Sequence, residues 1–102
     1  MPTRLEQLQK LLALEPNDPF LLYSTALEHA KTGDHARAVE FFDRCLAADP
    51  AYCYAYFHKA VSLKAADRAG EARDTLTAGI RAAQAAGDAK AIGELSGMLE
   101  SL

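Results

Sequence analysis

The sequence predicts an all-α protein of about six helices, and three observations support this fold class. Alanine and leucine dominate the composition, with 21 Ala and 14 Leu against two Val and two Ile, and Ala and Leu favour helices whereas strands favour β-branched and aromatic residues. Proline and glycine divide the 102 residues into segments of three or four helical turns. Within these segments large apolar residues recur at helical spacing, as Leu5, Leu8 and Leu12 do.

The first two helices are expected over residues 3–14 and 19–32. The first segment places its three leucines on one face and ends before Pro16. The second begins with a proline, a residue that suits the first helical turn, directly after the capping residue Asp18. It ends before Gly33, because glycine commonly terminates a helix.

The third and fourth helices are expected over residues 35–48 and 52–66. The third follows Asp34, an acidic residue suited to a helix N-terminus, and ends before Pro50. The fourth ends in the polar stretch that leads to Gly70. One face of the third segment is apolar and carries Ala38, Phe42, Cys45 and Leu46.

The last two helices are expected over residues 70–86 and 88–101, separated by Gly87 and Asp88. Apolar residues in the last segment would cover one end of a helical stack, as the leucines of residues 3–14 would cover the other. These covering residues are Ile92, Leu95 and Leu99.

Composition and charge exclude several classes of function. The chain carries 11 Lys and Arg against 14 Asp and Glu, a net charge of −3, which does not attract nucleic acid or an anionic membrane. No apolar run approaches the roughly 18 residues of a transmembrane helix, and the N-terminus does not resemble a signal peptide. Two cysteines are too few for a disulfide framework, so we expect reduced thiols and a cytoplasmic location. The length of 102 residues predicts a single domain over residues 1–102.

The sequence also repeats itself with a period of 34 residues. At this offset small residues match small ones, as Ala26 matches Ala60 and Ala38 matches Ala72. Large apolar residues match large ones in four pairs: Phe42 with Leu76, Tyr23 with Phe57, Leu27 with Val61 and Leu46 with Ile80. A period of 34 residues built from a helix pair is typical of one repeat class. Residues 19–52 and 53–86 therefore resemble two tetratricopeptide repeats.

The resemblance implies a right-handed superhelix of stacked helix hairpins. Residues 2–16 resemble the second (B) helix of a preceding repeat, and residues 88–101 are expected to cap the stack. Small residues let the two helices of a repeat approach closely, and larger ones fill the volume beside them. The residues expected to pack the repeats are Ala26, Ala38, Phe42, Cys45, Pro50, Ala60, Ala72 and Leu76, with Gly79 as the second small residue of the second repeat.

The second repeat departs from the family pattern at two positions. Asp67 occupies the place of the turn glycine, and Gln84 occupies the place of the closing proline. Without that proline the last B helix can continue to Gly87, so we expect it to be longer than the first.

No catalytic, cofactor-binding or metal-binding residues are predicted, and we expect that the protein is not an enzyme. Carboxylate pairs such as Glu40 with Asp43 are typical of solvated helix faces. The three histidines and two cysteines lack metal-ligand spacing. His29 and Cys45 are expected to pack in the core, and Cys53 is expected to be the more exposed cysteine.

A second apolar face on the first (A) helix of each repeat is the candidate site. In this family the A helices line the concave surface, and three-and-four spacing keeps each trio on one helix face. The six residues are Phe20, Tyr23, Leu27, Tyr54, Phe57 and Val61. Two alternatives remain open: the terminal helix folds over these residues, or the helix registers differ by one residue.

An exposed apolar face of this kind usually contacts a partner. We therefore predict a non-catalytic scaffold that binds a protein or peptide partner, with homodimerisation through the same face or a regulatory role in an enzyme complex as alternatives. Some members of the family grip a C-terminal carboxylate with Lys and Asn. The matching places here hold Tyr23, Leu27 and His58, so that mode of binding is not predicted.

Overall fold

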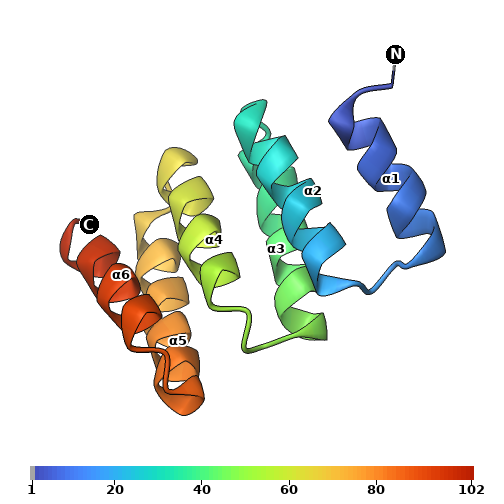
Figure 1. Cartoon of the computed structure of the whole chain (residues 1–102). Coiled ribbons are helices and arrows are strands. Elements are labelled where there is room, and N and C mark those ends of the chain that lie inside the picture. Colours follow the sequence, from blue (N-terminus) through green and yellow to red (C-terminus); the bar gives the residue numbers. More distant parts are fainter. Residues whose placement is uncertain (1) are drawn as a thin grey trace.

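The computed structural model describes residues 2–102, and over this range the chain forms six α-helices and no strand (Figure 1). Each expected segment corresponds to one helix, with bounds that agree within one residue, so the predicted all-α class is confirmed. The helices are α1 (Arg4–Leu14), α2 (Pro19–Lys31), α3 (His35–Ala48), α4 (Cys53–Ala65), α5 (Ala69–Ala86) and α6 (Ala89–Glu100).

Side-chain caps fix the start of four helices. Thr3, Asp18, Asp34 and Asp88 precede α1, α2, α3 and α6, and each side chain accepts a hydrogen bond from the backbone N–H three residues later. Such a cap stabilises a helix by about 1 kcal/mol, because it satisfies an N–H group that has no partner within the helix. The acidic residues at these starts therefore set where α2, α3 and α6 begin.

The helices stack in the order of the sequence, and packing is mostly between neighbours along the chain. Helix α2 packs against α3 and α4 against α5, and contacts between α3 and α4 join these two pairs. We call α2 and α4 the A helices and α3 and α5 the B helices. In Figure 1 the A helices and α6 lie side by side in one layer, with the B helices behind them. Among the described residues, α1 contacts α2 alone.

The small residues expected between the paired helices lie in the core clusters. Ala26 and Ala38 in the first pair, and Ala60 and Ala72 in the second, are fully buried. Phe42 and Leu76, together with Cys45, are larger buried residues of the same clusters, and all have no exposed surface. Pro50 is exposed in the α3–α4 connection.

Helix α5 is the longest, with 18 residues, and it is followed by the capping residue Gly87, whose φ is 68°. The expected lengthening of this helix is confirmed, because Gln84 leaves the backbone free to continue where a proline would interrupt it. Both cysteines are buried, and the more exposed of the two is Cys53, as expected. This side chain is only 7% exposed, and its Sγ donates a hydrogen bond to the Ala51 carbonyl at 3.3 Å.

The two end helices bury apolar side chains against the stack. Leu8 and Leu12 of α1 are buried, and Leu12 belongs to the core cluster of α2 and α3. Ala91 and Leu95 of α6 are buried in the cluster that α4 and α5 form. Ile92 and Leu99 pack against the same cluster.

Candidate functional site

The A-helix face is the set of six side chains predicted above on α2 and α4: Phe20, Tyr23, Leu27, Tyr54, Phe57 and Val61. Because α2 and α4 are in direct contact, the two trios lie on neighbouring helices at equivalent positions of the 34-residue period. Phe20 is 60% exposed and Val61 is 41% exposed. The other four side chains are half-buried, so this face is less open than the sequence predicts.

Tyr23 is half-buried because its ring lies in the seam between α2 and α4. The ring centroid is 4.9 Å from that of Tyr52, 5.8 Å from that of His58 and 6.0 Å from that of Phe42. Aromatic pairs at such distances stabilise packing beyond their buried area. Burial, followed by the nearby Tyr52, raises the pKa of Tyr23. Leu27 packs against the same core cluster.

The corresponding residues of α4 are covered in part from the other side. Phe57 packs against the core cluster of α4, α5 and α6. Loss of hydration, followed by the negative charge of Glu94 on α6, raises the pKa of Tyr54. Helix α6 packs against α4, and its Glu94 lies near Tyr54.

His58, named above only as a place where the carboxylate-gripping pattern is lacking, also lies beside this face. Its ring lies 5.3 Å from Phe57, 5.8 Å from Tyr23 and 6.5 Å from Phe42, and the side chain is half-buried. Burial lowers the pKa of His58, because the charged imidazolium loses hydration that the aromatic rings do not replace. The signal available in the sequence is its spacing of four residues from Tyr54, which places both on one side of α4.

The histidines and cysteines show no arrangement for catalysis. His29 is buried and stacks on Phe41 at 5.3 Å, and Cys45 is buried with its pKa raised to about 11 by burial and by Asp49. A thiol in this state is a poor nucleophile at neutral pH. Within residues 2–102, no group of three or more His, Cys, Asp or Glu side chains could hold a metal ion. Over the same range, no helix has the length and apolar character needed to cross a bilayer.

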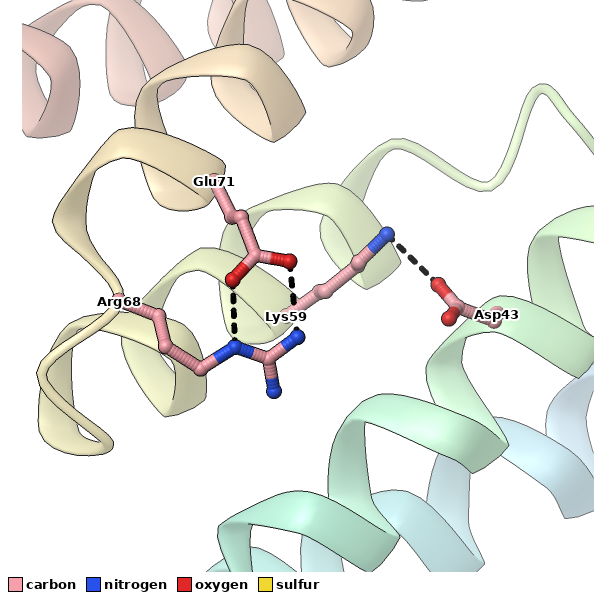
Figure 2. A network of polar contacts seen from close by, with 4 residues as sticks. All are labelled: Asp43, Lys59, Arg68 and Glu71. Carbon is pink, nitrogen blue, oxygen red and sulfur yellow. Dashed lines mark hydrogen bonds and ion pairs between the residues drawn. The ribbon is translucent and has the colours of Figure 1, made fainter.

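Asp43, considered above as half of a carboxylate pair, is instead bound to a lysine. Figure 2 shows Lys59 of α4 reaching Asp43 of α3 at 2.6 Å. The same view shows Arg68 and Glu71 paired at the start of α5, with Nη2 and Oε1 at 2.8 Å. Solvent and salt screen surface pairs of this kind, so they contribute little to stability. The first pair ties together the two helix pairs and has a structural role.

A feature that sequence reasoning missed is a small hollow of about 330 Å³ between the α3–α4 connection and the end of α5. The Tyr56 hydroxyl donates a hydrogen bond to the Pro50 carbonyl at 2.8 Å across this region. The hollow joins segments far apart in the sequence, so no local pattern indicates it. Its lining is mostly apolar and consists of Pro50, Ala51, Tyr56, Ala82, Ala85 and Ala86.

No protein-family model matches the chain, and no curated protein matches it in sequence. Solved structures do match. A crystal structure of a tetratricopeptide repeat domain protein from Salinibacter ruber is 33% identical, with a TM-score of 0.74, over 82% of this chain and 93% of that one. A solution structure of a tetratricopeptide repeat domain protein from the same organism is 34% identical, with a TM-score of 0.78, over 84% and 87%.

A third similar structure covers nearly the whole chain. A solution structure of a protein from Bordetella parapertussis is 25% identical, with a TM-score of 0.85, over 99% of this chain and 88% of that one. Helix α1 and helix α6 thus have counterparts in a solved structure. With the stacked helix pairs, the 34-residue period and one-third identity to tetratricopeptide repeat domain proteins, the chain belongs to the tetratricopeptide repeat family.

Proposed function

We propose that this protein is a non-catalytic interaction module that binds a partner peptide or helix through the A-helix face. Membership of the tetratricopeptide repeat family supports a general role as a protein-interaction scaffold. The observation that carries the specific proposal is the exposure of Phe20 and Val61 on two A helices in contact with each other. Large apolar side chains exposed on one face are typical of partner contacts.

The chemistry of this face favours an apolar partner. None of its six side chains carries a charge at neutral pH, and the half-buried tyrosines and Phe57 offer aromatic surface between the two exposed residues. Burying one large apolar side chain contributes about 1.5–3 kcal/mol, so a few such contacts sustain a micromolar complex. Because the contact is apolar, its affinity should change little with salt.

A peptide selection tests this proposal. Amphipathic peptides displayed on phage are selected on the wild-type protein, and the best ones are measured by calorimetry against the variant Phe20→Glu/Val61→Glu. Both substitutions place charge at exposed positions, so the fold should persist while affinity falls at least tenfold. The matched control is Leu14→Glu, since Leu14 is 81% exposed on α1, outside this face. Equal binding by all three proteins would contradict the proposal.

Self-association through the same face is a second candidate. The absence of charge among the six side chains allows two copies to meet there without like-charge repulsion. A standard interface buries about 800 Å² on each partner, which is a modest share of the 5798 Å² accessible surface. Light scattering on the wild type and on Phe20→Glu/Val61→Glu distinguishes the two candidates. A dimer that only the double variant dissociates supports self-association, and a wild-type monomer at millimolar concentration excludes it.

We propose no catalytic role and no binding of nucleic acid, membrane, cofactor or metal ion. These proposals rest on the net charge of −3 and on the lack of residue motifs for such chemistry. A cytoplasmic location stays a prediction from the two cysteines, which are both free thiols in the structure. A regulatory role in an enzyme complex stays an alternative, and it would need a convergent polar pocket.

A further inference from the structure

His58 lies beside two side chains of the A-helix face. Its ring contacts Tyr23 of α2 and Phe57 of α4, which both belong to this face, and it stacks at 17° on Phe42 of α3. One half-buried imidazole of α4 therefore lies against aromatic rings of α2 and α3, where the two helix pairs meet. A partner that occupies the face would cover the exposed part of this side chain.

The groups around His58 are aromatic or already paired. Lys59, the next residue, forms an ion pair with Asp43 of α3. Glu94 of α6 helps to raise the pKa of Tyr54, which lies one turn before His58. Burial is the cause that lowers the pKa of His58, and no neighbouring charge contributes to the shift. The titratable and charged groups that act on its neighbours Tyr23 and Tyr54, or pair with Lys59, are Asp43, Cys45, Tyr52, Asp88, Lys90 and Glu94.

A charged imidazolium loses hydration when an apolar surface covers it, whereas a neutral imidazole loses much less. We propose that His58 makes occupation of the A-helix face dependent on pH, so that an apolar partner binds when His58 is neutral and is released when His58 is protonated. This inference rests on the function proposed above and adds its regulation.

The sign and size of the effect follow from linkage. Above the pKa of His58 the free protein is already neutral there, so the affinity does not change with pH. Below it, a proton must leave before the partner binds, and the affinity falls by up to tenfold for each pH unit. Because burial lowers this pKa from its usual value near 6.5, the fall should begin below pH 6.5.

The test uses the uncharged dye Nile red as an apolar probe, titrated with wild-type protein from pH 8 to pH 5 under conditions where circular dichroism shows an intact fold. We expect binding that Phe20→Glu/Val61→Glu abolishes and that weakens at least threefold between pH 7 and pH 5. The variant His58→Gln should bind equally at both pH values. The matched control His35→Gln should keep the pH dependence, because His35 lies on α3 with its Nδ1 3.4 Å from the Ser62 hydroxyl.

A second measurement needs no variant of His58. The imidazole resonances of the wild type are titrated by NMR with and without saturating Nile red, and the dye should lower the pKa of His58 further. Two results would contradict the proposal that the A-helix face binds an apolar partner. They are no dye binding at pH 8, and dye binding that the double variant retains. Binding lost in the double variant but constant from pH 8 to pH 5, with an unmoved His58 titration, overturns only the role of His58.

Discussion

Two glycines in the second half of the chain have opposite surroundings. A Cβ atom at Gly79 of α5 would lie 2.6 Å from Cβ of Tyr56 on α4, whereas one at Gly93 of α6 would meet no atom within 4 Å. At Gly79 the missing side chain therefore lets α4 and α5 approach each other. At Gly93 it has no such role.

We predict that Gly79→Ala destabilises the protein by about 1–3 kcal/mol through overpacking. Alanine raises helix propensity by about 1 kcal/mol relative to glycine, but the clash with Tyr56 involves atoms close to the backbone that cannot move aside. The control Gly93→Ala gains the propensity without the clash and should stabilise by about 0.5–1 kcal/mol. Urea unfolding of both variants measures the difference, and equal effects would show that the helix approach at Gly79 is not tight.

At the residue scale, the sequence predicted core positions better than the openness of the A-helix face. The alanines expected between the paired helices are identified by type and period, because only a small residue fits there. The burial of Tyr23 depends on Tyr52, which lies between α3 and α4, and on His58. Aromatic contacts across separate segments leave no mark on the periodicity of either helix, so the pattern alone assigned Tyr23 to an open surface.

At the scale of elements, the turns within the two helix pairs can be compared directly. Gly33 ends the α2–α3 turn with φ of 86°, and Asp67, its equivalent 34 residues later, adopts φ of 61°. Both backbones are left-handed, a conformation that costs an ordinary L-residue roughly 1–2 kcal/mol. Asp tolerates it better than most residues but less well than glycine.

We therefore expect Asp67→Gly to stabilise the protein by about 0.5–1 kcal/mol. The reciprocal variant Gly33→Asp should lose a similar amount, because the same strain is introduced at the equivalent turn. Thermal unfolding followed by circular dichroism checks both. A lower melting temperature for Asp67→Gly would mean that the aspartate side chain itself stabilises its turn.

The helix bounds were predictable because each boundary has a local chemical cause. Aspartates cap α2, α3 and α6, and proline or glycine ends the preceding segments. The greater length of α5 was predictable because Gln84 stands where the family pattern has its closing proline. The division into repeats at residues 19–52 and 53–86 stays a prediction, since helix pairs alone do not fix where one unit ends.

At the scale of the whole molecule, α6 closes the second core cluster. Leu95 is 1% exposed and belongs to the cluster with Leu63 and Leu76. Deleting residues 88–102 would expose that apolar surface to water. We predict aggregation or a clearly lower melting temperature for the truncated chain, measured by light scattering and calorimetry.

The full-length variant Leu95→Ala separates packing from chain length. It leaves α6 in place and should destabilise the protein by about 2–5 kcal/mol, as expected for a buried leucine replaced by alanine. A truncated chain that stays monomeric with an unchanged melting temperature, together with a neutral Leu95→Ala, would show that α6 does not protect the core.

Packing between chain neighbours also bears on how quickly this molecule reaches its native state. Most helix contacts join consecutive elements, and the exceptions, α2 with α4 and α4 with α6, skip a single helix. Short loops close with little loss of chain entropy, so each hairpin can form before distant segments meet. Helical proteins with such low contact order fold in microseconds to milliseconds. Rapid, stepwise assembly leaves the apolar edges of each hairpin exposed only briefly, which limits the time available for misassociation with other chains during synthesis.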